Sequence, residues 1–138
     1  MSSNIIKSND WVLIDVKNKI LGRAASKIAC ILTGKSNINY NYNSVSGYQV
    51  IVINARHIMV SGNKVNNKFY YRHSGFPGGL KILRFKEIFS SNPSFVLRNA
   101  ISGMLPKNKL RKIFLRRIRI YSDDIHPHMC QKPQNLNI

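Results

Sequence analysis

The sequence predicts a single α/β domain over residues 1–138, with a mostly parallel four-stranded sheet and helices on both faces. Apolar patterns typical of strands and helices follow one another in the order strand, helix, strand, strand, helices, strand. The run Gln49–Ile53 is continuously β-branched after its first residue, which is typical of a strand buried on both faces. A length of 138 residues suits one domain with its own hydrophobic core.

The elements of the first half follow from local patterns. Trp11–Val16 is a short apolar run that ends in a turn, which predicts a buried strand. Apolar side chains then recur at helical spacing from Leu21 to Leu32, and Gly34 follows as a helix stop. The next stretch is rich in Asn, Ser and Tyr and predicts a loop before the central strand. Ile58–Val60 is a further short apolar run and predicts another strand.

Helices are expected after a glycine-rich segment. The glycines and the proline of Gly75–Gly79 argue against a long helix there. Phe85–Phe89 predicts a short helix. Asn92 and Pro93 are typical of an N-cap followed by the first residue of a second helix, which Pro106 ends.

The last part of the chain combines a basic helix, a strand and a tail. Lys107–Leu115 predicts one or two further helical turns, and the alternation in Arg117–Tyr121 predicts a half-exposed strand with an arginine face. Residues 122–138 hold His, Pro, Gln and Asn and are expected to form an irregular tail. Residues 1–10 are expected to be a flexible N-terminal extension, with no targeting peptide.

Charge is the strongest functional signal in the sequence. Twenty-two Lys and Arg face five Asp and Glu, which gives a net charge of +17. Residues 16–86 contain eight Lys and four Arg and no acid, and Lys107–Arg119 contains seven bases in thirteen residues. Such a chain repels itself unless a polyanion neutralises it, and nucleic acid is the commonest one. An anionic membrane surface is the alternative, with Lys107–Arg119 as the one candidate amphipathic helix.

Two basic segments are candidate RNA-binding sites. Tyr70–Lys81 mixes aromatic rings that can stack on bases, glycines that allow close approach to a phosphate, and bases. An ordinary turn with buried rings explains this composition equally well. In Pro106–Arg119, Leu110, Ile113 and Phe114 would dock on the core while the bases meet phosphates.

Other classes of site have less support. His126, His128 and Cys130 alternate, but structural zinc needs four ligands, so no metal site and no cofactor are expected. Two cysteines, Cys30 and Cys130, indicate a reducing compartment rather than a disulfide framework. Five acids leave few groups for acid–base chemistry, which argues against an enzyme.

Seven ordered motifs are together similar to the bacterial-type L-thirteen family of large-subunit ribosomal proteins. They are Trp11-Val-x-Ile-Asp15, Leu21-Gly-Arg-x-Ala-Ser26, Val50-Ile-Val-Ile-Asn-Ala55, Ser61-Gly-Asn-Lys64, Tyr70-Tyr-Arg-His-Ser-Gly-x-Pro-Gly-Gly-Leu-Lys81, Ala100-x-x-Gly-Met-Leu-Pro-Lys107 and His126-Pro-His128. The resemblance covers residues 11–138 and has no large insertion. It implies a non-enzymatic ribosomal protein that binds large-subunit ribosomal RNA, contacts neighbouring large-subunit proteins and supports early subunit assembly.

The resemblance and the charge pattern together predict a set of RNA-binding residues. These are Arg23, Lys27, Lys35, Lys64, Lys68, Tyr71, Arg72, His73, Ser74, Gly75, Gly78, Gly79, Lys81, Lys107, Lys109, Arg111, Lys112, Arg116, Arg117, His126 and His128. Recognition is expected to act mainly through phosphates and RNA shape. The expected location is the ribosome in the cytoplasm of a bacterium, with an organelle that has its own genome as the alternative. A regulatory complex with messenger RNA and an RNA-modifying enzyme remain alternative functions, and no membrane partner is expected.

Overall fold

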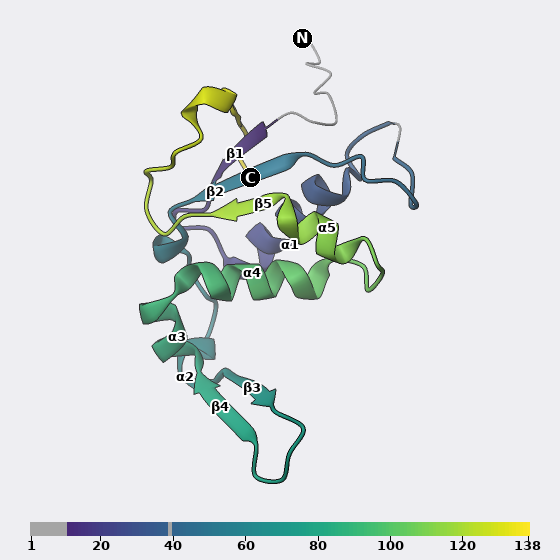
Figure 1. Ribbon diagram of the computed structural model, residues 1–138. Coiled ribbons are helices and arrows are strands. Elements are labelled where there is room, and N and C mark those ends of the chain that lie inside the picture. The colour runs from purple at the N-terminus through teal and green to yellow at the C-terminus, as the bar shows by residue number, and fades with distance from the viewer. Residues whose placement is uncertain (1–10, 39) are drawn as a thin grey trace.

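Apolar runs far apart in the sequence line up as parallel strands. In the computed structural model, which describes residues 11–38 and 40–138, the central sheet has the order β5-β2-β1-β6. Its strands are β1 (Trp11–Asp15), β2 (Gln49–Ile53), β5 (Ile118–Ile120) and β6 (Gln134–Asn135). All three pairings are parallel, and Figure 1 shows β1, β2 and β5 side by side. The predicted α/β class with a four-stranded parallel sheet is confirmed. The N-terminal extension predicted for residues 1–10 lies outside the described residues.

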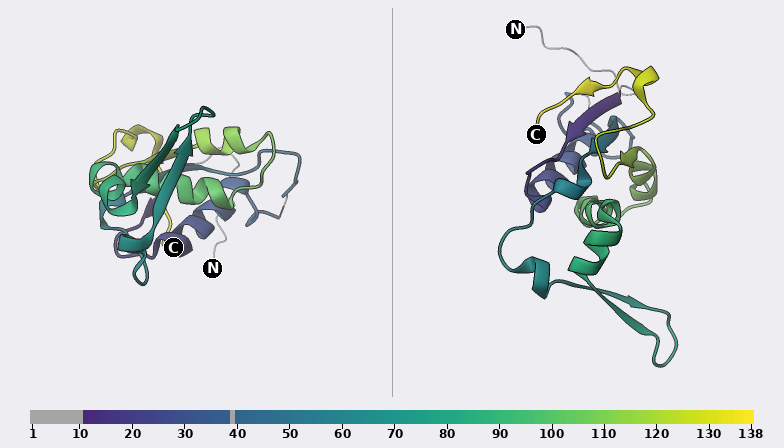
Figure 2. Two further views of the ribbon diagram at one scale, coloured as in Figure 1. Left: turned by 90° about the horizontal axis from the view of Figure 1, so that it is seen from below. Right: turned by 90° about the vertical axis from the view of Figure 1, so that its left-hand side faces the viewer.

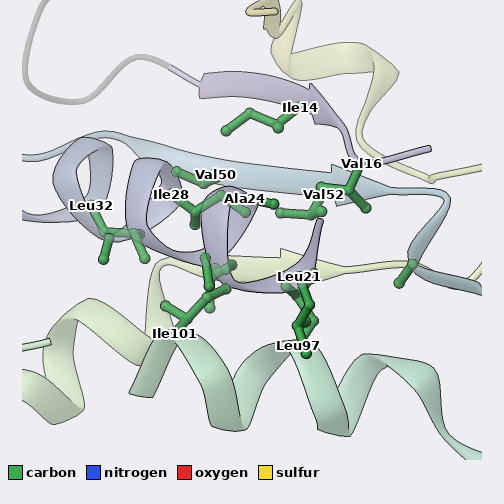
Figure 3. Packing of buried hydrophobic residues seen from close by; sticks show 14 of the residues in the cluster. Ile14, Val16, Leu21, Ala24, Ile28, Leu32, Val50, Val52, Leu97 and Ile101 are labelled. Atoms are coloured by element: carbon green, nitrogen blue, oxygen red, sulfur yellow. The ribbon is translucent and has the colours of Figure 1, made fainter. Parts of the chain in front are cut away.

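The two faces of the sheet have different covers. Val12, Ile14, Val50 and Val52 are fully buried in the main hydrophobic core, against helices α1 (Leu21–Thr33) and α4 (Pro93–Met104). Figure 3 shows α1 between β2 and α4, with Leu97 and Ile101 of α4 turned towards it. Because side chains alternate along a strand, Ile51 faces the other way, and it is also fully buried.

Helix α1 follows its predicted bounds closely. Its eight buried residues recur at helical spacing and form the face that packs on the sheet and on α4. The helix ends at Gly34, which has a φ of 76°. The Gly34 N–H donates to the carbonyl of Ile31, and the Lys35 N–H donates to that of Cys30. This pair of hydrogen bonds is the Schellman termination that glycine favours.

The N-terminus of α4 depends on a side-chain cap. The Asn92 Oδ1 accepts a hydrogen bond from the backbone N–H of Phe95 at 3.1 Å, and Pro93 occupies the first helical turn. We expect Asn92→Ala to lower the free energy of unfolding by about 1 kcal/mol, because the Phe95 N–H loses its side-chain acceptor and keeps only the Asn92 carbonyl at 3.2 Å. Asn99→Ala, at an exposed position inside the same helix, is the matched control and should be neutral or slightly stabilising. Urea denaturation of both variants measures the difference, and equal stabilities would contradict the capping role.

An antiparallel hairpin is the main element that the sequence patterns did not predict. Strands β3 (Phe69–His73) and β4 (Leu80–Arg84) pair along their full length in a separate two-stranded sheet. Short helices flank the hairpin, namely α2 (Lys64–Asn67) before it and α3 (Phe85–Ser91) after it. Figure 1 and the right-hand view of Figure 2 show the hairpin extending away from the central sheet and α4.

Two predicted elements need correction. The run Ile58–Val60 is not a strand of the sheet. It follows the 3₁₀ turn η1 (Ala55–His57), and its one β-type pairing is an isolated bridge between Met59 and Ile20. The fourth strand is instead β6, in the tail that was expected to be irregular, where Gln134 and Asn135 pair with β1. The rest of the tail carries the 3₁₀ turn η2 (Met129–Gln131).

The basic segment after α4 forms a shorter helix than expected. Helix α5 (Arg111–Arg116) begins four residues later than predicted, and β5 follows it directly. Phe114 of α5 is buried in the core, while Leu110 and Leu115 pack partly against it. The prediction that Ile113 also docks on the core is wrong, because its side chain points to solvent and is 41% exposed. Within the ranges 11–38 and 40–138, no helix is long and apolar enough to cross a membrane.

Candidate nucleic-acid interface

The hairpin is attached to the body of the protein by aromatic side chains at its base. Tyr70 stacks on Phe85 at a ring-centroid distance of 6.3 Å and meets Phe95 edge-on at 6.2 Å. Phe85 is fully buried and stacks in turn on Phe89. Burial raises the pKa of the Tyr70 phenol above its usual value. These contacts fix the hairpin base, while its outer part remains exposed to solvent.

Two bases face each other across the hairpin. Arg72 and Lys81 are directly opposite in the ladder, and both are exposed. Like charges at opposite positions of an antiparallel pair destabilise it, and no acid lies between residues 16 and 86 in the sequence. A bound phosphate would remove this repulsion by contacting both side chains. The predicted residues Arg72 and Lys81 therefore lie together, in an arrangement that suits an anion.

The tip of the hairpin is a compact turn. Pro77 and Gly78 occupy the central positions of a turn closed by a hydrogen bond from the Gly79 N–H to the Phe76 carbonyl, and the φ of Gly78 is 72°. The Gly75 N–H donates to the Nδ1 of His73 at 2.9 Å. The N–H groups of Gly75 and Gly79 are thus used inside the tip, although the sequence suggested that they could bind a phosphate. Ser74 and Gly78 are exposed on the same tip.

Further predicted bases lie beside the hairpin. Lys64 and Lys68 line a surface hollow together with Asn63 and Asn67. The Lys68 ammonium lies 5.4 Å from the centre of the Tyr70 ring, a distance suited to a cation–π contact. Helix α2 and the residue that follows it thus add two bases to those of the hairpin.

The segment around α5 divides into exposed and internal bases. Lys107, Lys109, Lys112 and Arg116 are exposed, as an RNA contact requires. Arg111 instead donates to the Ser102 Oγ of α4 at 2.8 Å. Figure 1 shows this segment and the hairpin on different sides of α4.

Arg117 has an internal partner of its own. Its Nη1 donates to the Gly47 carbonyl at 2.7 Å, across 70 residues of sequence. The guanidinium groups of Arg111 and Arg117 thus hold the segment onto the body of the protein, and the RNA contacts predicted for both residues stay a prediction. Lys107, Lys109, Lys112 and Arg116 are the predicted bases of this segment that remain exposed.

A third group of bases lies on the outer face of α1. Arg23 and Lys27 are exposed one turn apart and line a hollow with Lys19 and Ser26. The predictions omitted Lys19, which precedes the helix by two residues, is exposed, and lines the same hollow as Arg23. Lys35 is exposed just after the helix. Arg84, at the end of β4, is a second exposed base that the predictions omitted.

The predicted histidines of the tail have internal partners. His126 is 8% exposed, and its Nδ1 accepts a hydrogen bond from the backbone N–H of His128. The Nε2 of His128 is hydrogen-bonded to the Tyr121 hydroxyl at 2.8 Å, and its ring stacks on Trp11. This stack covers part of the second face of the sheet, which Trp11 shares with Ile51. In the described part of the chain, no three His, Cys, Asp or Glu side chains gather as a metal ion would need.

The acids offer little compensation for these bases. Asp15 accepts hydrogen bonds from the Lys17 N–H and the Asn54 amide, so it stabilises a turn. Within residues 11–38 and 40–138 the one ion pair joins Arg56 to Asp123 at 3.7 Å, and both side chains are 64% exposed. An exposed pair of this kind contributes about 0–1 kcal/mol. Among the described residues, the exposed bases of the hairpin, α5 and α1 therefore have no ion-pair partner, and each group makes its part of the surface electropositive.

Comparison with known proteins places these features in a family. The model of one family, described as ribosomal protein L13, matches residues 9–127. A protein of Geobacter sp. (strain M21) named large ribosomal subunit protein uL13 is 45% identical over 131 residues, which cover 95% of this chain and 92% of the relative. A protein of the same name from Wigglesworthia glossinidia brevipalpis is 41% identical, over 99% of this chain and 95% of the relative. Another, from Buchnera aphidicola (strain Sg), is 46% identical, over 98% of this chain and 94% of the relative. The match spans nearly the whole chain, and the chain belongs to the ribosomal protein L13 family.

Proposed function

We propose that the protein is a structural component of the large ribosomal subunit that binds large-subunit ribosomal RNA. The observation that carries this proposal is the set of exposed bases without ion-pair partners, within residues 11–38 and 40–138, on a chain of the L13 family. Relatives from several bacteria carry the name of a large-subunit protein. The proposed place of action is the ribosome in the bacterial cytoplasm, and the proposed role is structural rather than catalytic.

The contacts are proposed to be mainly with phosphates. Arg and Lys side chains hold phosphate oxygens without reading the base sequence, so recognition depends on the shape of the folded RNA. The three groups of bases lie on separate elements, which allows the protein to contact more than one RNA segment. The residues proposed to bind are Arg23, Lys27, Lys35, Lys64, Lys68, Arg72, Lys81, Lys107, Lys109, Lys112 and Arg116.

We also propose the role in early subunit assembly that the family resemblance implies, and the charge of the chain supports it. A chain with a net charge of +17 gains stability when RNA neutralises it, so binding and folding support each other. The folded protein would in turn hold RNA segments in position for later components. Neighbouring large-subunit proteins are proposed to complete its surroundings.

Neutralising the two opposed bases of the hairpin tests the phosphate contacts. We expect Arg72→Gln with Lys81→Gln to weaken binding to large-subunit ribosomal RNA, and to reduce the slope of log affinity against log salt by about 1.4 to 1.8. The same two changes remove a like-charge repulsion, so the free protein should be at least as stable as the unmodified one. Filter binding across a salt series measures the slope.

A control with the same net charge separates a local contact from general attraction. Lys17→Gln with Lys132→Gln removes two exposed bases outside the three groups and should change the slope less. If both double variants lost the same affinity and slope, the hairpin would contribute only through net charge, and its proposed phosphate contact would be wrong.

A further inference from the structure

The hairpin has two faces with different chemistry. Residues opposite each other in an antiparallel ladder share a face, and successive residues alternate. The pairing of Arg72 with Lys81 and of Tyr70 with Leu83 defines one face. The other, here called the ring face, comprises Phe69, Tyr71, His73, Leu80, Ile82 and Arg84.

The ring face is exposed along its whole length. Tyr71 is 66% exposed, and the aliphatic side chains of Leu80 and Ile82 are 53% and 54% exposed. An isolated two-stranded hairpin is marginally stable in water, so a surface of this kind gains stability when a partner covers it. The charged residues of the face are bases, and the adjoining tip carries Phe76, which is 75% exposed.

The rings of this face have no aromatic partner inside the protein. In the part of the chain that the structure describes, ring contacts involve Tyr70 at the hairpin base, but none involves Phe69, Tyr71 or His73. The two adjacent tyrosines therefore differ in role. Tyr70 anchors the hairpin, whereas the Tyr71 ring is available to a partner.

The spacing of the three rings suits nucleobases. Phe69, Tyr71 and His73 alternate on one strand, so the backbone advances about 6.8 Å from one ring-bearing residue to the next. A base in a stack occupies about 3.4 Å, which leaves room for one base between two neighbouring rings. The hydrogen bond from the Gly75 N–H fixes the third ring of the series.

We propose that the ring face of the hairpin stacks with unpaired nucleotides of RNA through Phe69, Tyr71 and His73. The inference rests on the proposed RNA-binding function and specifies its target at this surface. Arg84 on the same face and the Arg72–Lys81 pair on the other supply cations for the phosphates of the same strand. Stacking tolerates any base, so the contact selects single-stranded segments rather than a sequence.

Substitutions at Tyr71 test the stacking contact in the full-length chain. The probes are an oligoadenylate of about 12 nucleotides and an RNA duplex of about 12 base pairs, compared at one salt concentration. We expect Tyr71→Leu to weaken oligoadenylate binding by about 5- to 150-fold, and to leave duplex binding within about twofold. Tyr71→Trp, which restores a ring, should bind oligoadenylate as well as the unmodified protein does.

Two controls identify a failure. Ile82→Ala removes apolar area from the same face without removing a ring and should have a much smaller effect on oligoadenylate binding. Equal affinities of the Tyr71→Leu variant and the unmodified protein would overturn the stacking proposal, as would a Tyr71→Trp variant no better than Tyr71→Leu. If the true partner of the ring face were an apolar protein surface, the Tyr71→Leu variant would still bind it. If the unmodified protein bound neither the two probes nor ribosomal RNA, the proposed RNA-binding function would be wrong as well. If only the stacking proposal were wrong, the protein would still bind ribosomal RNA.

Discussion

The affinity of the protein for large-subunit ribosomal RNA is expected to fall by about 10³-fold or more when monovalent salt rises from about 50 to about 200 mM. The reason is counterion release, because each phosphate neutralised by a Lys or Arg frees condensed cations from the RNA. The exposed bases of the hairpin, α5 and α1 are enough to neutralise about six to eight phosphates. Filter binding or fluorescence anisotropy with a ribosomal RNA fragment measures the affinity at each salt concentration.

The salt response also discriminates between binding mechanisms. A complex held mainly by stacking or by base-specific hydrogen bonds loses little affinity over this range. A shallow response, with binding otherwise intact, would contradict the phosphate mechanism. Circular dichroism at each salt concentration is the control, because the fold should not change over this range.

Replacing Gly47 by alanine is expected to have the largest effect on stability. A Cβ atom at this position would lie 1.8 Å from the carbonyl oxygen and 2.4 Å from the carbonyl carbon of Leu32. These are backbone atoms at the end of α1, so the strain is relieved only if α1 and β2 separate. The loss should be about 3 kcal/mol or more, and the melting temperature should fall by about 10 °C. Differential scanning calorimetry of Gly47→Ala measures both quantities.

A second glycine provides the matched control for this substitution. Gly103 lies in α4, is exposed, and has no atom within 4 Å of the position that a Cβ would take. Gly103→Ala should therefore raise stability by about 0.5 to 1 kcal/mol through higher helix propensity. If Gly47→Ala melted at the temperature of the unmodified protein, the close packing of the β2 entrance against α1 would be wrong.

The elements predicted correctly are those in which the same face stays buried over several helical turns or strand positions. The apolar residues of α1 recur every three or four positions because one face of the helix is buried, and Gly34 ends the periodicity. β2 is continuously apolar after Gln49 because both faces of the sheet are covered. Burial imposes such patterns locally, and local sequence is therefore sufficient to find them.

The elements that were missed have no burial pattern. The hairpin is exposed on most of both faces, so Phe69–His73 and Leu80–Arg84 show no alternation of apolar and polar residues. β6 has two polar residues, Gln134 and Asn135, and its strand conformation comes from pairing with β1. Strands of this kind are defined by their partner rather than by their own sequence.

The candidate interface shows the same division. The exposure of bases such as Arg72 and Lys107 agrees with the charge pattern, and their RNA contacts, which the family resemblance also implies, stay a prediction. The internal role of Arg117 depends on Gly47, a partner 70 residues away. Long-range hydrogen bonds of this kind arise from the fold, so charge patterns cannot distinguish them from RNA contacts.

Sedimentation of a cell lysate through a sucrose gradient tests the central claim most directly. The protein is followed by antibody in gradients at moderate and then at high salt. A structural component of the large subunit should sediment with that subunit at moderate salt and remain there after the high-salt wash, because many phosphate contacts are made together. A protein found at the top of the gradient even at moderate salt would contradict this account and would require another working partner.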